Sequence, residues 1–431
     1  MSRQKYNSIK PQLNHDAISA QGGFTLIELL VAAAGGLILM GFMAVVFGFY
    51  GRTVRENQAI IRMNDALRSA SYKLRQDLQG VTCDVTPWQK PEADAGYFEL
   101  IEGPLTDANA ADGNTNLVAD IDDVLLFTTR GNGAGFVGKH DTSTIGASAA
   151  EVAWFCVQQP GPLVDGMNLY SLHRRQLLVM GYVGTNPGFL PTNTSGVPIH
   201  PDQISKTIPN VFQEYDISLR QEGSFLLANG LSDLTKRENR FLHRHHSTTG
   251  YTIPAINQSV VNTIFPYVLD SARFISDAVL TGDRAGEDVV IRNVLSFDVR
   301  VFDPEGSPPD YIDLGSGGPT MLAGAGNFNT PTYCTWSYHY EFNGLSENQD
   351  NAGATDSIDN DGDGQVDEAG EDLVDEGTDL LDNNGNEAID ETAEFETAPP
   401  YNVPLHGIEI RLRCYEPQGK QIRQVTVRHA F

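Results

Sequence analysis

The sequence predicts an α+β protein, in which one long N-terminal helix packs against an antiparallel β-sheet head with large loop insertions. Two patterns in the 431-residue chain lead to this fold class. Apolar residues recur at helical spacing from Ile60 to Val81, whereas apolar and polar residues alternate in several segments after Cys83. A repeat of about 3.6 residues is typical of an amphipathic helix, and a repeat of two is typical of a half-buried strand.

The first predicted element is a long apolar run. Phe24–Tyr50 contains 27 residues and a single charged side chain, Glu28. As a helix this run is about 40 Å long, which exceeds the roughly 30 Å of a bilayer's hydrocarbon core. A secretory signal peptide would have a shorter apolar core and a small-residue cleavage site after it. A simple membrane anchor has the right length but leaves Glu28 unexplained, because carboxylates in membranes are costly and usually functional.

The helix is expected to continue beyond the apolar run as an amphipathic segment. Its apolar residues form one stripe, with spacings of 3, 4, 3, 4, 4 and 3: Ile60, Met63, Leu67, Ala70, Leu74, Leu78 and Val81. No proline, the residue that most strongly breaks helices, occurs between residues 24 and 81. We therefore expect a membrane half at 24–50 and an amphipathic half at 51–82, whose stripe packs on the head.

Residues 83–346 are predicted to form a β-rich head. Glu151–Gln158 and Asn168–Met180 are strand-like runs, and the Pro-Gly-Pro and Asp-Gly turn signals between them indicate a hairpin. The alternation in Phe297–Val301 predicts a further half-buried antiparallel strand.

The C-terminal segment 401–431 is predicted to complete this head as a β-hairpin. In Ile408–Cys414 the apolar residues alternate with Glu and Arg, and Val425 and Val427 follow the turn Pro417–Lys420. This alternation again predicts half-buried antiparallel strands.

The negative charge of the chain is concentrated in one insert, residues 347–400. The net charge is -27, and the stretch from Asp350 to Glu396 contains 18 Asp and Glu residues with no Lys or Arg. Nucleic-acid binding is not expected, because phosphate contacts need clustered cations.

Two related motifs lie inside this insert. The stretch "DSIDNDGDGQVDE" (Asp356–Glu368) recurs 23 residues later as "DLLDNNGNEAIDE" (Asp379–Glu391). Carboxylates at alternate positions of a tight loop supply the oxygen ligands that calcium prefers, as in the first half of an EF-hand loop. The twelfth position is Gly370 instead of Glu, so the motif departs from a standard EF-hand and is closer to thrombospondin-type calcium repeats.

The candidate calcium ligands are the oxygen-bearing side chains of the two motifs: Asp359, Asp361, Asp363, Gln365, Asp367, Glu368, Asp382, Asn384, Asn386, Asp390 and Glu391. The alternative is a disordered acidic linker that only solvates. We favour calcium because a plain charge run would not repeat its Asx, Gly and apolar positions in register.

No catalytic motif stands out, so we expect no enzyme activity. The sequence contains no G-x-S-x-G, no H-E-x-x-H and no Gly-rich phosphate-binding loop. The cluster "HRHH" (His243–His246) is either a transition-metal site or, more simply, an exposed loop.

The start of the apolar run carries a family resemblance. The stretch "GGFTLIELL", Gly22 to Leu30, resembles the class III signal of type IV pilins and type II secretion pseudopilins. The resemblance implies that a prepilin peptidase removes the leader 1–23 by cutting between Gly23 and Phe24, and then methylates the new amine of Phe24. It also implies that Glu28, by then the fifth residue, pairs with the N-terminal amine of a neighbouring subunit in a filament. Such pairing offsets part of the desolvation cost of both charges.

The same resemblance implies a function. A helix followed by strands is the pilin order, and "LYSLHRR" (Leu169–Arg175) and "VLSFDVRVFDP" (Val294–Pro304) resemble the J-type minor pseudopilin and the PilW-type minor pilin. A minor subunit at or near the tip of a type IV pilus or type II secretion pseudopilus is therefore expected, with a calcium-stabilised head. It would be a single-pass inner-membrane protein with a periplasmic head, in contact with lipid, with other pilin subunits and with the assembly platform. The alternatives are an adhesin-like pilin whose calcium insert binds a surface or ligand, and a membrane-tethered hydrolase.

Four cysteines, Cys83, Cys156, Cys334 and Cys414, complete the candidate residues. None forms a C-x-x-C pair, so the cysteine spacing argues against a zinc site and against a thioredoxin-like redox site. A head outside the cytoplasm, as the resemblance implies, permits disulfides, and three pairings are possible. We prefer Cys334–Cys414, because both residues lie in strand-like runs late in the chain.

Overall fold

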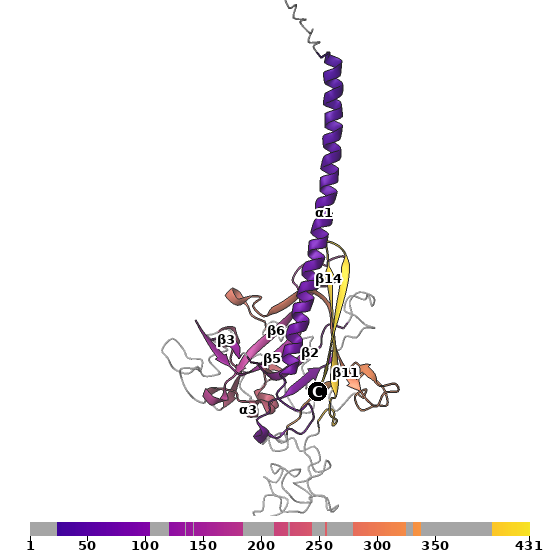
Figure 1. Cartoon of the computed structure of the whole chain (residues 1–431). Helices are drawn as coiled ribbons and strands as arrows, with labels where there is room; N and C mark the ends of the chain where they lie inside the picture. Colours follow the sequence, from indigo (N-terminus) through magenta and orange to yellow (C-terminus); the bar gives the residue numbers. More distant parts are fainter. Residues whose placement is uncertain are drawn as a thin grey trace, which may run out of the picture. The chain divides into compact units, whose positions relative to one another are not determined.

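The structure, a computed structural model, describes residues 24–103, 120–133, 135–140, 142–183, 211–222, 225–243, 255–256, 279–324, 331–337 and 399–431 (Figure 1). The chain divides into two compact units, Met1–Gln58 and Ala59–Phe431. The predicted leader and both acidic motifs lie outside the described residues.

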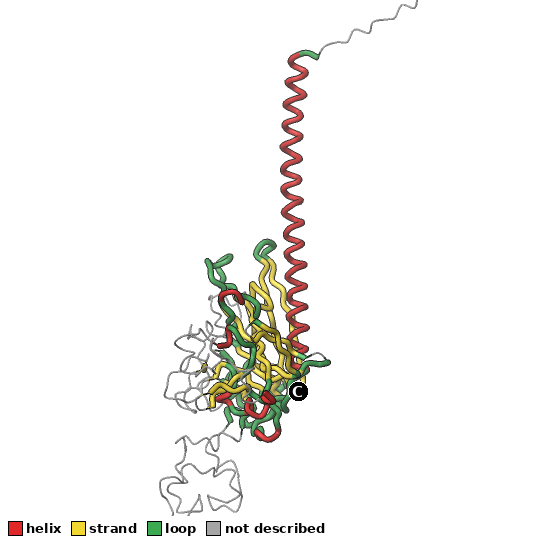
Figure 2. Tube along the Cα trace, turned by 90° about the vertical axis from the view of Figure 1, so that its left-hand side faces the viewer, coloured by secondary structure: helices red, strands yellow, loops and turns green. Residues whose placement is uncertain are grey.

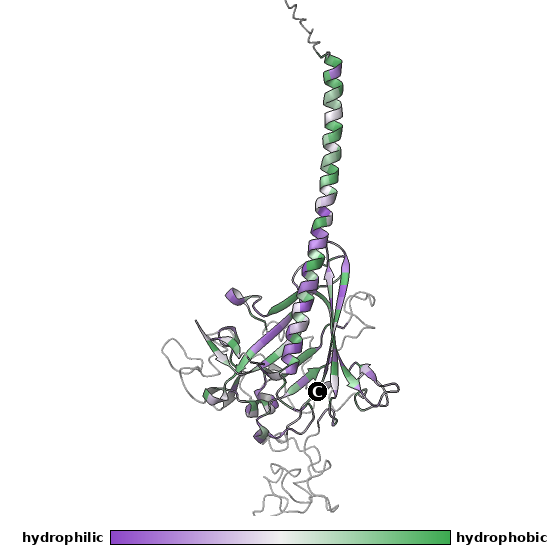
Figure 3. Cartoon of the chain, viewed as in Figure 1, coloured by the Kyte–Doolittle hydropathy of each residue, from purple (hydrophilic) through white to green (hydrophobic). Residues whose placement is uncertain are grey.

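The N-terminal helix α1 runs without interruption from Leu26 to Gln79, as the sequence predicts. Every residue from Phe24 to Tyr50 is exposed, and the visible side of this part is mostly apolar (Figure 3). This helix is long and apolar enough to cross a membrane. It ends three residues earlier than the predicted boundary because Gly80 lies against the sheet. The N–H of Arg130 donates to the Gly80 carbonyl at 2.7 Å, and a Cβ at Gly80 would collide with the backbone oxygen of Arg130.

The head is built on a nine-stranded sheet, in which every pair of neighbouring strands is antiparallel. Figure 2 shows the strands of the head in yellow. Its strand order is β13-β1-β2-β5-β6-β11-β14-β15, and β12 pairs with β11. These strands are β1 (Phe98–Ile101), β2 (Val124–Arg130), β5 (Ala149–Gln158), β6 (Tyr170–Val179), β11 (Val289–Asp303), β12 (Asp310–Ile312), β13 (Thr332–Cys334), β14 (Gly407–Glu416) and β15 (Gln421–Ala430). The α+β class is therefore confirmed.

Shorter elements lie beside this sheet. They are β3 (Phe136–His140) with β4 (Ser143–Ala147), β7 (Leu219–Glu222) with β8 (Phe225–Ala228), β9 (Leu242–His243) with β10 (Ala255–Ile256), and the short helix α3 (Leu231–Thr235).

Both hairpins predicted from the sequence are present. β5 and β6 pair antiparallel from Ala149↔Val179 to Gln158↔Tyr170. β14 and β15 pair along their full length, from Gly407↔Ala430 to Glu416↔Gln421, around the predicted turn.

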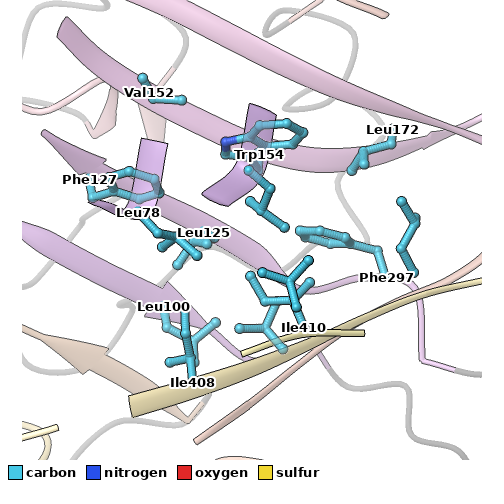
Figure 4. Close-up of a cluster of buried hydrophobic side chains, with 14 of the residues drawn as sticks. Leu78, Leu100, Leu125, Phe127, Val152, Trp154, Leu172, Phe297, Ile408 and Ile410 are labelled. Atoms are coloured by element: carbon cyan, nitrogen blue, oxygen red, sulfur yellow. The ribbon is translucent and has the colours of Figure 1, made fainter. Parts of the chain in front are cut away.

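Each of the two faces of the sheet carries a cluster of buried hydrophobic side chains. Along β1, Ile101 belongs to one cluster and Leu100 to the other, because successive side chains of a strand point to opposite faces. The cluster that contains Leu100 also contains the buried stripe of α1: Met63, Leu67, Ala70, Leu74 and Leu78. Figure 4 shows Leu78 among sheet side chains such as Phe127 and Trp154. The part of α1 from Met63 to Leu78 therefore packs on one face of the sheet.

The alternating strands are more deeply buried than their sequence predicts. Asp298 in β11 and Glu409 in β14 occupy polar positions of the alternation, yet both are buried. At Asp298 the reason is the segment before β2, whose Asp120 carbonyl accepts the Phe297 N–H at 3.0 Å. Glu409 is buried between arginines, and its carboxylate accepts from Arg428 Nε at 2.6 Å. The half-buried interpretation is therefore wrong at these two positions.

Candidate functional sites

The first candidate site is the start of α1, where Thr25 and Glu28 cap the helix. The Thr25 N–H and hydroxyl donate to Glu28 Oε2 at 2.9 and 3.0 Å, and the Glu28 N–H donates to Thr25 Oγ1 at 3.3 Å. This reciprocal arrangement is a capping box, in which two helix-end donors are satisfied. The sequence pattern that predicts this capping box, Thr-x-x-Glu before an apolar run, is present at Thr25–Glu28, but the sequence analysis did not interpret it as a cap.

The capping box changes what Glu28 needs from a partner. Two local donors reach one of its oxygens within the isolated chain, so part of its desolvation cost is already offset. Phe24, which precedes the cap, is 85% exposed.

The second candidate site is a buried ion pair between α1 and the sheet. Arg174 of β6 donates to both carboxylate oxygens of Asp77, from Nε at 2.6 Å and from Nη2 at 2.7 Å. The indole N–H of Trp154 in β5 donates to the same carboxylate at 3.0 Å. Paired, bidentate geometry of this kind fixes the position of the helix on the sheet.

A cleft of about 550 Å³ opens beside this pair, between α1 and the β2–β3 connection. Its lining includes Lys73, Arg75, Arg130 and Arg174, with Asp77 as the acidic residue among them. The surplus of cations suits an anionic group.

The third candidate site is a group of three buried carboxylates. Glu102 follows β1, whereas Asp120 and Asp123 precede β2, and one oxygen of each lies within 4.8 Å of those of the other two. Their exposed fractions are 4%, 1% and 1% in that order. The sequence analysis missed this group, although "DIDD" directly before an apolar strand was a visible signal.

Burial and mutual repulsion dominate the electrostatics of this group. Desolvation, followed by the neighbouring carboxylates, raises the pKa of Glu102 and of Asp120 well above their usual values. Desolvation also raises the pKa of Asp123, although the N–H groups of Val299 and Gly103 oppose this rise.

The predicted Cys334–Cys414 disulfide is absent from the structure, in which all four cysteines are free and buried. Cys334 and Cys414 lie in different hydrophobic clusters, on strands far apart in the sheet order. The thiol of Cys334 contacts Arg240 Nη1 at 2.9 Å instead. Proximity in sequence was a poor guide, because the strand order separates β13 from β14.

Of the predicted site residues, the structure places Phe24 and Glu28 at the exposed start of α1, whereas Gly22, Gly23 and all eleven candidate calcium ligands lie outside the described residues. Comparisons of the chain with protein-family models, with curated proteins and with solved structures find no match.

Proposed function

We propose that this chain is a minor pilin or pseudopilin, a structural subunit of a type IV pilus or type II secretion pseudopilus. The observation that carries the proposal is the exposed apolar run Phe24–Tyr50, which begins directly after Gly22–Gly23 in the sequence and forms the first half of α1 from Leu26 onward. An exposed apolar helix needs either lipid or other helices around it. A subunit that waits in a membrane and then packs into a filament meets both needs in turn.

The architecture of the head agrees with this role. The amphipathic half of α1 packs on an antiparallel sheet, which leaves the apolar half available for other subunits. We place the head in the periplasm and the assembly platform, the prepilin peptidase and further pilin subunits among its partners. The acidic insert would bind calcium through its two motifs and thereby become ordered.

The first test is the intact mass of the protein recovered from membranes or sheared filaments. We expect a chain that begins at Phe24 and carries one N-terminal methyl group. An uncleaved chain, or cleavage at another bond, would contradict the proposal.

A second test separates the two roles of Glu28. Glu28→Gln keeps the capping box, since glutamine also serves at this position, but removes the charge. Glu28→Ala removes both. If Glu28 pairs with the amine of a neighbouring subunit, both variants fail to enter filaments. Normal incorporation of Glu28→Gln would show that capping alone is needed. Glu56→Gln, a charge removal further along α1, serves as the matched control.

A further inference from the structure

Asp120 is a buried acid that no N–H or hydroxyl group of a described residue reaches. Within the described residues only the carboxyl of Asp122 is close enough to hydrogen-bond with it, and that group donates only when protonated; Asp120 itself is 1% exposed. Asp123, by contrast, accepts from the N–H of Val299 at 2.7 Å and of Gly103 at 3.2 Å. Glu102 accepts from the N–H of Leu314 at 3.3 Å. A buried carboxylate with no donor is costly unless a cation or a proton neutralises it.

The surroundings of Asp120 favour a cation. One of its oxygens lies within 4.8 Å of one oxygen of Glu102 and one of Asp123, so the three acids could share one ion. A fourth, Asp122, is half-buried and lies against Gly103, where a Cβ would collide with its carboxylate. If each acid were neutralised by a proton, several carboxyl oxygens would still have no hydrogen-bond donor. A single divalent ion, by contrast, can be coordinated by oxygens from all of these acids.

The spacing suits calcium. Calcium–oxygen distances are about 2.3–2.6 Å, so two ligands of one ion lie at most roughly 5 Å apart. The three oxygens meet this limit, since all lie within 4.8 Å of one another. Magnesium needs shorter bonds of about 2.0–2.1 Å and retains several waters, which fits a deeply buried acid group less well.

We propose that Glu102, Asp120 and Asp123 bind one calcium ion inside the head, with Asp122 on the side open to solvent. The ion ties the end of β1 to the start of β2, the two ends that flank residues 104–119. It is linked to β11 as well, because Asp123 accepts the Val299 N–H. Its ligands come from residues 102–123 and include none of the insert's candidate ligands, and the site does not depend on the proposed role in a filament.

The test uses the full-length protein in detergent micelles, with the insert motifs silenced by Asp359→Asn, Asp361→Asn, Asp363→Asn, Asp382→Asn and Asp390→Asn. After removal of metal with a chelator, calcium is titrated by calorimetry and thermal unfolding is followed by tryptophan fluorescence. We expect this parent chain to bind one calcium ion. Its Tm should rise by roughly 5–10 °C at a hundredfold excess of calcium over the Kd.

Adding Asp120→Asn to this parent should abolish both the binding and the shift in Tm. The matched control is Asp310→Asn, an exposed acid at the start of β12, which should leave both unchanged. In chelator, Asp120→Asn should melt at or above the Tm of the parent, because it removes one of several repelling carboxylates. Magnesium at equal concentration should give a smaller shift.

Three results would overturn the site itself. The first is that the parent chain fails to bind calcium, and the second is that the shift in Tm persists in Asp120→Asn. The third is that Asp120→Asn has a lower Tm than the parent in chelator. The last result would mean that the protein alone satisfies the Asp120 carboxylate. An equal or larger shift with magnesium would overturn calcium as the ion.

Discussion

At the scale of single residues, buried charges are positioned by partners far away in the chain. Asp77 lies on α1, and its partner Arg174 is 97 residues further along, on β6. The apolar stripe of α1 could be read from spacing alone, but this pair could not, because it depends on which strand lies under the helix. The same holds for Glu102 and Asp120, which only the pairing of β1 with β2 brings together.

We predict that Asp77→Asn lowers the free energy of unfolding by about 3–5 kcal/mol, because it leaves the Arg174 guanidinium buried without its counter-ion. Asp65→Asn, on the exposed side of the same helix, should change it by less than about 0.5 kcal/mol. Denaturant titration measures both values. Equal effects of the two substitutions would show that the buried pair contributes nothing specific.

A second residue-scale prediction concerns pH. Asp288 is buried, which by itself raises its pKa. However, His173 Nδ1 lies 3.1 Å away and the Leu280 N–H donates to the carboxylate, and together these hold the pKa below its usual value. A depressed acid pKa stabilises the fold above the unfolded-state pKa of about 3.9, and this contribution is lost as the pH falls through the folded-state pKa.

Asp288→Asn should therefore lower the free energy of unfolding by about 1–3 kcal/mol at pH 7, and by progressively less below about pH 4. Denaturant titrations of both chains at pH 7, 5 and 3.5 provide the comparison. A difference that stays constant across these pH values would contradict the assigned role of His173.

The cysteines give a third residue-scale prediction. Burial raises the pKa of the Cys83 and Cys414 thiols to about 12, so neither forms a reactive thiolate at neutral pH. We expect four titratable thiols per unfolded chain and almost no reaction with a thiol reagent in the native protein. Two thiols after unfolding would instead show that one disulfide exists.

At the scale of elements, α1 was predictable because its apolar periodicity and lack of proline are local properties. The hairpins β5–β6 and β14–β15 were predictable for the same reason, since a turn joins neighbouring runs. The burial of Asp298 and Glu409 was not predictable, because alternation shows only that the two faces of a strand differ in polarity. What covers the polar face depends on segments that are remote in sequence.

The stripe of α1 can be tested directly. Leu74→Ala should lower the free energy of unfolding by about 2–5 kcal/mol, because Leu74 is 2% exposed within the cluster beneath the helix. Ile61→Ala is the matched control, since Ile61 directly follows the first residue of the stripe but is 58% exposed. Similar losses in both variants would contradict the packing of this stripe on the sheet.

At the scale of the whole molecule, the division into two units predicts that the head folds without the apolar half of α1. A chain that begins at Ala59 retains the full buried stripe, so it should be soluble without detergent and melt at the Tm of the full-length protein. A chain that begins at Ser71 loses Met63, Leu67 and Ala70 from the core and should melt well below it. Circular dichroism measures both, and a low Tm for the Ala59 chain would contradict the division.

The bond between Asp77 and Arg174 has a mechanical consequence. A force that pulls on α1 along its axis reaches the head through the buried stripe and through this ion pair, which joins the end of the helix to β6. Because β6 is paired with β5 on one side and β11 on the other, the load spreads into the middle of the sheet instead of onto an edge strand. The buried stripe and the ion pair are distributed along the helix axis. A pull along this axis therefore loads all of these contacts at the same time and does not break them one after another.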